Sequence, residues 1–495
     1  MLFNSLNFAI FLPIVFILYW FVINKNLKTQ NALLLIASYF FYGWWDWRFL
    51  FLLALLSLTN YLIGIGIEKN KTNRKGKIWL ISGLVVNIGA LVVFKYYNFF
   101  IDGFINLISL VGYELPRSTT KIILPLGISF YVFLSLSYII DVYKKNLTAN
   151  RNIVEVLLAL SFFPIILAGP IQRPVLLLPQ ITKKREFNYS QAVDGLKQIL
   201  WGLFVKVVIA DNLAKYVDDF FLNYSNYSGS TLFLGAVFYT FQIYADFSGY
   251  SDMAIGIAKI FGFSLMRNFA YPYLSRDITE FWKRWHISLT TWFRDYVFLP
   301  LSFIVSWRIK GEKTLFIKSD LFIYIVASTI TWFLTGLWHG ANYTFIIWGL
   351  IHGFFLIVYR LQKNPRKKLF KRIGITNNHS VVVFFETIIT LFIVIMAWIF
   401  FRAENIGHAI KYLSEIFSPS LLSVPDFPER RRALTIIILL IGFVFIEWFG
   451  REHQYAISNL GIKWGRPFRY AMYYAIIIAI IWFGGKQHQF IYFQF

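Results

Sequence analysis

His339 is the residue of this sequence whose type and surroundings point most clearly to chemistry. It lies in residues 334–343, LTGLWHGANY, where one long apolar stretch ends and another begins. Keeping an ionisable, proton-carrying side chain at membrane depth costs free energy, so such a residue is a candidate functional site. A neutral imidazole can take a proton from a hydroxyl, and we therefore interpret His339 as a candidate general base.

Two further histidines stand in aromatic surroundings. For His286 the sequence leaves two interpretations open, a ring that satisfies a backbone carbonyl or a ring that lines the site. His352 follows His339 by 352 − 339 = 13 residues, which on one helix means about 20 Å of rise and roughly 220° of rotation. The two do not readily share a ligand, so we expect His352 to be structural or part of a wall. The remaining histidines are expected to be ordinary surface or interface residues: His379, His408, His453 and His488.

Acidic residues in apolar stretches offer a different chemistry. Residues 244–253, YADFSGYSDM, hold Asp246, Ser248 and Asp252, and Asp141 lies at the end of another apolar stretch. Such acids could carry protons or ions in a transporter, or contact a substrate along a tunnel. Structural hydrogen bonding is the ordinary alternative. We take Asp246, Ser248 and Asp252 as candidate substrate-contacting residues.

The sequence predicts neither a metal site nor a bound cofactor. It has no cysteine and no pair of histidines four residues apart, which two zinc ligands on one helix need. It also lacks the GxSxG, GxxxxGK[ST] and GxGxxG patterns of hydrolases and nucleotide-binding proteins. A histidine base is the most economical chemistry that remains.

The elements that must position these residues are membrane helices. With 495 residues, 58% hydrophobic, 20% aromatic and only 15% charged, the chain is not a soluble globular protein. The first apolar stretch has no basic segment before it and no cleavage site after it, so we read it as a retained helix. Thirteen stretches are candidate spans, one or two of them re-entrant or interfacial: 6–22, 31–46, 49–66, 78–98, 121–140, 153–169, 194–210, 230–247, 321–338, 342–359, 381–401, 433–449 and 470–484.

The charge distribution predicts how these spans are oriented. The chain carries 48 Lys and Arg against 25 Asp and Glu, a net +23, which we assign to basic cytoplasmic flanks and not to nucleic-acid binding. Residues 68–77 and 360–372 are basic and are predicted to be cytoplasmic, as is the loop with Arg308, Lys310 and Lys313. The junction with His339 then lies toward the outer side, and we expect this histidine at the floor of a pocket.

Residues 264–320 mix charged with aromatic residues and so differ from the apolar spans. Asp277 and Glu280 form a capping-box pattern, so a helix is predicted to begin near Asp277. Trp282, Trp285, Leu289 and Phe293 then fall on one apolar stripe, opposite a charged face that holds Lys283, Arg284 and Arg294. We expect one amphipathic helix that lies in or dips into the membrane. No linker or internal repeat is evident, and residues 1–495 are predicted to form a single membrane domain.

Several of these motifs together resemble the membrane-bound O-acyltransferase family. The resemblance covers nearly the full length, with a signature core at about residues 120–360, and is closest to the bacterial branch that includes the alginate O-acetylation membrane component. The motifs that carry it are 247–256 (FSGYSDMAIG), 281–289 (FWKRWHISL), 294–296 (RDY) and 336–341 (GLWHGA), with 1–5, 125–131 and 397–403 matching that branch.

The resemblance implies an all-α polytopic fold of about 11–13 transmembrane helices, with re-entrant or interfacial helices, around a central tunnel. It makes His339 the catalytic residue and His286 the second signature position, with Trp285, Trp338 and Asn342 as tunnel or orienting residues. The implied donor is acetyl-CoA, which reaches the site from the cytoplasm. The implied acceptor is an extracytoplasmic polysaccharide, served through a periplasmic or cell-surface acetyltransferase partner. The implied location is a bacterial cytoplasmic membrane.

Two other functions stay open at this point. One is transfer of D-alanine from a carrier protein toward teichoic acid, which a related branch performs; the length of the chain and residues 397–403 favour acetylation instead. The other, from a different class, is a polysaccharide or lipid transporter that uses Asp246 or Asp252 as coupling residues. Transporters usually show internal repeats with paired broken helices, and none is evident here.

Overall fold

Long apolar helices dominate the computed structural model, which describes residues 1–114, 122–309, 311–372, 374, 376, 378–485 and 488–493. Six of the described helices are long and apolar enough to cross a membrane: Trp47–Lys69, Arg74–Ser109, Ser319–His339, Tyr343–Arg366, Ser380–Arg402 and Arg430–Gly450. Leu6–Val22 and Ile128–Tyr143 are shorter apolar helices. Position 121 of the predicted stretch 121–140, and Lys310, lie outside the described residues.

The chain divides into two compact units, and the first comprises Met1–Ile199 with Tyr250–Met266. Its core includes a reciprocal pair of buried amides, in which Asn60 on α3 and Asn87 on α4 donate to each other at 3.1 and 2.8 Å. Its helices and π-helical turns are α1 (Leu6–Ile17), η1 (Leu18–Val22), α2 (Leu27–Gly43), α3 (Trp47–Lys69), α4 (Arg74–Leu91), η2 (Val92–Tyr96), α5 (Tyr97–Ser109), α6 (Ile128–Tyr143), α7 (Ile153–Ser161) and α8 (Pro174–Thr182). Helices α9 (Tyr189–Phe204) and α11 (Gly229–Ile260) contribute residues to both units.

The second unit, Leu200–Gly249 with Arg267–Phe495, holds both candidate histidine motifs. Its helices are α10 (Asp211–Leu222), α12 (Ile278–Arg284), α13 (Ile287–Phe293), α14 (Leu299–Arg308), α15 (Ser319–His339), α16 (Tyr343–Arg372), α17 (Ser380–Arg402), α18 (Ile406–Ile416), α19 (Arg430–Gly450) and α20 (Arg466–Phe483). Its short turns are η3 (Val205–Ala210), η4 (Tyr224–Asn226), η5 (Pro272–Leu274), η6 (Arg294–Phe298), η7 (Pro419–Leu422) and η8 (Ile491–Phe493).

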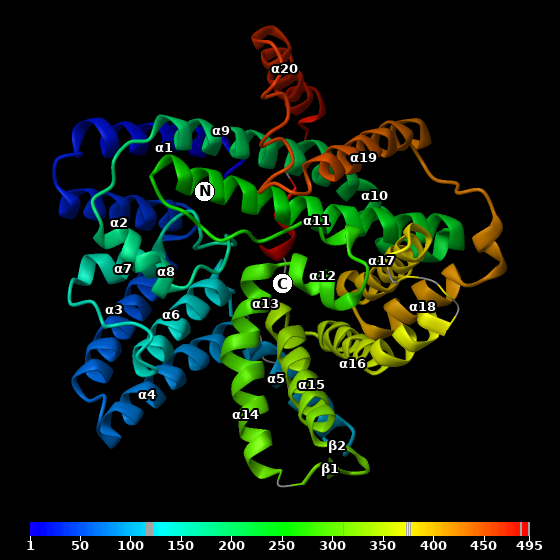
Figure 1. The fold of residues 1–495 in the computed structure, drawn as a ribbon, viewed down its shortest axis with the longest axis horizontal. Coiled ribbons are helices and arrows are strands. Elements are labelled where there is room, and N and C mark those ends of the chain that lie inside the picture. Colours follow the sequence, from blue (N-terminus) through cyan, green and yellow to red (C-terminus); the bar gives the residue numbers. More distant parts are fainter. Residues whose placement is uncertain are drawn as a thin grey trace. The chain divides into compact units, whose positions relative to one another are not determined.

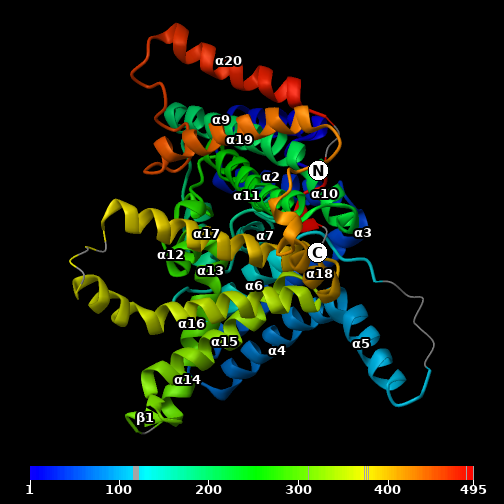
Figure 2. The ribbon, with the colours of Figure 1, turned by 90° about the vertical axis from the view of Figure 1, so that its right-hand side faces the viewer.

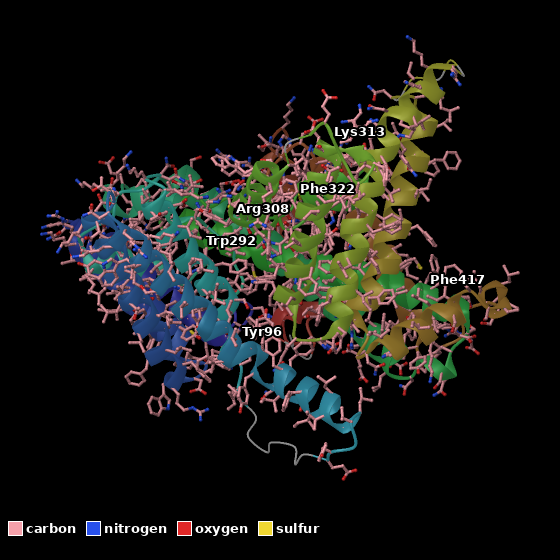
Figure 3. The ribbon with its side chains drawn as sticks, turned by 90° about the horizontal axis from the view of Figure 1, so that it is seen from below. Tyr96, Trp292, Arg308, Lys313, Phe322 and Phe417 are labelled. Carbon is pink, nitrogen blue, oxygen red and sulfur yellow. The ribbon has the colours of Figure 1, made fainter. Side chains whose placement is uncertain are left out.

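One small hairpin interrupts this helical unit. Strands β1 (Lys313–Thr314) and β2 (Ile317–Lys318) pair antiparallel, with Lys313 opposite Lys318. They join α14 to α15, which lie side by side (Figure 1). Helix α16 continues through the basic run 360–372 and packs against α17 (Figure 2). Arg308 and Lys313 lie at the same end of the α14–α15 pair (Figure 3), which gathers basic charge at the hairpin end.

Glycines bring α15 and α16 into close contact. A Cβ added at Gly336 would collide with the backbone oxygen of Phe345, and one added at Gly349 would collide with that of Trp332. Side chains at these positions would therefore force the helices apart. This contact fixes the end of α15, where His339 is the last helical residue.

Two predictions about helices are corrected here. The stretch 153–169 is not a continuous span, because α7 ends at Ser161, and Pro164 disfavours helical backbone in the residue before it. The single amphipathic helix predicted from Asp277 is two short helices, α12 and α13, which are separated at Trp285 and His286. The predicted start is confirmed, since Asp277 caps α12.

The glycine contact predicts a position-specific loss of stability. Gly336→Ala should lower the thermal unfolding midpoint in detergent, because overpacking a tight contact costs about 1–3 kcal/mol. Gly442→Ala, on α19, is the matched control, because a Cβ there meets nothing within 4 Å. An unchanged midpoint for Gly336→Ala would contradict the packing described.

Candidate functional site

His286 is carried by a sharp turn between α12 and α13. Asp277 Oδ1 accepts hydrogen bonds from the backbone N–H groups of Thr279 (2.8 Å) and Glu280 (2.9 Å), while Glu280 accepts one from Arg276 N–H at 2.8 Å. This reciprocal capping box fixes the first turn of α12. The helix then ends, and His286 has a left-handed backbone with φ 42°.

Tertiary hydrogen bonds explain why the predicted helix breaks at this residue. Ile287 N–H donates to Asn268 O at 2.8 Å, and Ala270 N–H donates to Arg284 O at 2.9 Å. These bonds attach the turn to residues 268–270 and replace the hydrogen bonds that a continuous helix would make. A periodic apolar stripe does not reveal partners of this kind.

The same asparagine orients the ring of His286. Its Oδ1 lies 3.0 Å from His286 Nδ1 and accepts a bond from Ser288 Oγ at 2.9 Å. Nδ1 is therefore the protonated nitrogen, and Nε2 carries the lone pair. Nε2 is buried and has no hydrogen-bond partner among the described residues. Burial lowers the pKa of His286 to about 3, so the ring is neutral at physiological pH.

His339 ends α15 inside an aromatic enclosure. Its ring centroid lies 4.8 Å from that of Trp338, 4.8 Å from Trp348 and 5.2 Å from Phe401. Gly340 follows with extended backbone, and a Cβ there would collide with the ring of Phe345. The glycine after the histidine therefore lets the chain leave the helix while aromatic rings close around the imidazole.

Tyr492 contacts both histidines. Its ring centroid lies 5.6 Å from that of His339 and 6.2 Å from that of His286. Trp338 completes the group, at 6.1 Å from His286 and 6.4 Å from Tyr492. Two histidine rings, an indole and a phenol ring thus meet in one buried site.

Residues 488–493 reach this site through contacts with buried charges. Lys206 Nζ lies 2.6 Å from Asp246 Oδ1 and 2.7 Å from Asp211 Oδ1, and it donates to His488 O at 3.3 Å. Asp246 Oδ2 accepts a bond from Ile491 N–H at 2.8 Å. Asp246 is therefore an ion-paired residue that contacts the backbone of this segment.

The other predicted site residues have different surroundings. Trp285 is buried against Trp398, at 4.9 Å, and Asn342 caps α16 through Thr344 N–H at 3.1 Å. Asp252 accepts a bond from Gln198 at 2.7 Å in the first unit, whereas Ser248 is buried in the second.

His352 is enclosed by aromatic rings without touching Tyr492. Its ring centroid lies 4.9 Å from that of Trp282 and 5.0 Å from that of Trp348. Neither of its ring nitrogens has a hydrogen-bond partner among the described residues. Trp348 also contacts His339, at 4.8 Å, and the structural or wall role of His352 stays a prediction.

Sequence reasoning missed Tyr492 and Lys206. A lysine inside the apolar stretch 194–210 is itself a signal, because an ionisable residue at membrane depth needs a partner. The run 489–493, QFIYF, follows the last predicted span and carries one hydroxyl among apolar and aromatic side chains. Neither pattern identifies its contacts, which join residues far apart in the chain.

A cavity of about 260 Å³ lies beside the histidine region in the second unit. Lys283 and Arg294 are among its lining residues, together with Thr279, Thr290, Ser328, Thr331 and Thr335. Thr335 precedes His339 by four residues on α15, which is a rise of about 6 Å along the helix. The cavity therefore ends about one helical turn before the histidine. Within the described residues, no group of His, Asp or Glu is arranged to hold a metal ion.

Comparison with known proteins places this site in a family. The sequence model of MBOAT, the membrane-bound O-acyltransferase family, matches residues 36–401. The chain belongs to this family. It is therefore an acyltransferase and a multi-pass membrane protein, and the resemblance seen in the motifs is confirmed.

Relatives in the membrane-bound O-acyltransferase family include proteins with different acceptors. A Pseudomonas putida protein named probable alginate O-acetylase AlgI is 35% identical over 100% of both chains. The peptidoglycan O-acetyltransferase of Helicobacter pylori is 35% identical over 83% of this chain and 79% of its own. The teichoic acid D-alanyltransferase of Bacillus subtilis is 30% identical, over 49% of this chain and 60% of its own.

The geometry of His286 predicts the outcome of a conservative substitution. Asparagine tolerates left-handed backbone and can keep a side-chain N–H toward Asn268, but it has no counterpart of Nε2. If Nε2 acts in transfer, His286→Asn should lower acyl transfer about 10²-fold while the unfolding midpoint stays near that of the wild type. Wild-type transfer in a well-folded His286→Asn protein would assign His286 a structural role instead.

Proposed function

We propose that this enzyme moves an acetyl group from cytoplasmic acetyl-CoA across the membrane for O-acetylation of an extracytoplasmic polysaccharide. The observation that carries the proposal is the contact of one buried hydroxyl side chain, Tyr492, with both His286 and His339. Relatives named for O-acetylation, similar over most of the chain, support acetyl as the transferred group. The D-alanyltransferase relative matches only 49% of it.

The cavity beside α15 suits a thioester donor. Lys283 offers positive charge for the phosphates of CoA, whereas Arg294 lines the same cavity while paired with Asp295 at 2.6 Å. Trp282, Phe293 and Trp332 supply apolar walls for the thioester arm of CoA. Among the lining residues of the cavity, Thr335 is the one nearest to His339 in sequence. A donor bound there would present its acyl carbonyl toward the end of α15. Basic residues at the hairpin, including Arg308 and Lys313, support a cytoplasmic position for this side.

The chemistry follows from the state of the Tyr492 hydroxyl. Burial raises the pKa of Tyr492 well above its usual range, so the phenol stays protonated and needs a base to become a nucleophile. His339 takes the phenol proton as the Tyr492 oxygen attacks the thioester carbonyl. The new C–O bond forms, the C–S bond breaks, and the CoA sulfur leaves with the proton returned by His339. The acetyl group is then an ester on Tyr492.

A second transfer releases the acetyl group toward the outside. A hydroxyl of the acceptor attacks the tyrosyl ester, and the phenol oxygen leaves with the proton that the base has taken from that hydroxyl. The acceptor is a polysaccharide or the nucleophile of a periplasmic or surface acetyltransferase that serves it. We place the enzyme in the bacterial cytoplasmic membrane, with His339 facing the outer side. Aromatic rings around the ester limit its loss to water.

The contacts of Asp246 argue against a transporter. One of its oxygens is paired with Lys206, and the other accepts the N–H of Ile491. A coupling residue must bind and release its proton or ion during each cycle, whereas Asp246 is satisfied by groups of the protein itself. The acyltransferase family fits the same site without such a requirement.

His339→Ala should lower the initial rate at which acetyl groups are added to the cell-surface polysaccharide by about 10²–10⁴-fold, because it removes the general base. The measurement is acetyl release from isolated polysaccharide, in a strain where membrane levels of the variant equal those of the wild type. Unchanged acetylation at equal expression would contradict the role given to His339.

Tyr492→Phe should abolish transfer as completely as His339→Ala, although it removes a single oxygen atom. Tyr474→Phe, at an exposed position of α20, is the matched control and should acetylate normally. Transfer by Tyr492→Phe at the wild-type rate would show that the acetyl group goes directly to the acceptor.

A further inference from the structure

Lys206, Asp211 and Asp246 make a buried charge cluster that bonds the backbone of residues 488–493. An ammonium group has three N–H donors. In Lys206 they face Asp246 Oδ1 at 2.6 Å, Asp211 Oδ1 at 2.7 Å and His488 O at 3.3 Å. The side chains of Lys206 and Asp246 are only 5% and 3% exposed. Removing residues 488–493 would leave donors and acceptors of this cluster without partners, which is costly for buried charges.

The contacts of the cluster set the register of the segment. Lys206 donates to the carbonyl oxygen of His488, and Asp246 accepts the N–H of Ile491, so both contacts are with backbone atoms. The residue after Ile491 is Tyr492, whose ring lies 4.3 Å from that of Phe247, the neighbour of Asp246 on α11. A slip of one residue would bring Ile491 or Phe493 to the histidines in place of the hydroxyl.

The position of Lys206 depends on a local irregularity of its helix. Residues 205–210 form a π-helical turn, η3, directly after α9. Such turns insert one residue into a helix and are frequent at functional sites. Asn212, just beyond this turn, donates from Nδ2 to Phe483 O at 3.2 Å, which gives the chain leading to residues 488–493 a second attachment.

We propose that Lys206 and Asp246 are positioning residues, forming a latch that holds residues 488–493 in the one register that places Tyr492 between His286 and His339. The expected effect of the latch on acyl transfer rests on the proposed function. Its effect on the position of residue 492 is independent of that function, and the two effects can be measured separately.

A cysteine reporter can test the latch directly, because the natural chain contains no cysteine. Tyr492→Cys is purified in detergent, and its rate of reaction with a maleimide is measured alone and combined with Asp246→Asn, Lys206→Met or Ile491→Pro. The proline variant removes the N–H that Asp246 accepts and fixes φ at residue 491, and it leaves the buried charges in place. Ile491→Val keeps that N–H and is the matched control at the same position.

Further controls separate the latch from general disorder. Asp194→Asn breaks another Lys–Asp pair, with Lys259 at 2.6 Å, and should leave the labelling rate unchanged. Ala327→Cys, a second buried reporter on α15, should stay protected in every background. A variant in which the cysteines at positions 327 and 492 both become reactive is misfolded. In that case the proline variant, which alters no buried charge, provides the test.

We expect Asp246→Asn, Lys206→Met and Ile491→Pro each to raise the labelling rate at position 492 by a factor of about ten or more, since each removes an ion pair or a hydrogen bond that involves a charged group. The same substitutions in the Tyr492 protein should lower acetyl transfer, and Asp246→Asn with Ile491→Pro should lower it no further than one alone. Protection of position 492 in all three backgrounds would overturn the latch. Exposure there, together with normal transfer by Tyr492→Phe, would uphold the latch and overturn the proposed function.

Discussion

The contact between α15 and α16 constrains every other part of the site. Gly336 and Gly349 let the two backbones meet, so that α15 ends with His339 facing Trp348 of the next helix. The rings of Trp338, Trp348 and Phe401 enclose the imidazole. An imidazole in such an enclosure can move a proton to or from a hydroxyl brought to it, and an ester formed there is protected from hydrolysis.

That enclosure limits how a nucleophile can reach the base. Apolar rings surround His339, so a group that approaches it must bring its own hydrogen-bond partners or lose those it had in water. The segment 488–493 meets this requirement because its backbone is bonded to Lys206 and Asp246. The polar partner of His286 is Asn268, which holds the ring through Nδ1 and leaves Nε2 without a partner among the described residues. The segment and His286 are thus both placed by hydrogen bonds to polar side chains.

The sequence allowed the class of fold to be predicted and singled out the two histidines as candidates, and the reasons are local. Apolar stretches predict spans such as α15 and α17, and Asp277 with Glu280 predicts the start of α12. The turn at His286 was not predictable, because its bonds to Asn268 cross 18 residues of chain and compete with a clear helical period. The pairing of Asp246 with Ile491 spans 245 residues, and no periodic pattern encodes it. The roles first considered for Asp246, in transport or substrate contact, came from its type and setting alone.

The acetyl group itself provides the most direct test of the account. Purified protein is incubated with acetyl-CoA in the absence of acceptor, quenched in acid and digested, and the peptide that contains Tyr492 is analysed by mass spectrometry. The account predicts one acetyl group on Tyr492 in the wild-type protein and none in His339→Ala. Release of CoA without acetylation of this peptide, or acetylation that persists without His339, would contradict the transfer described.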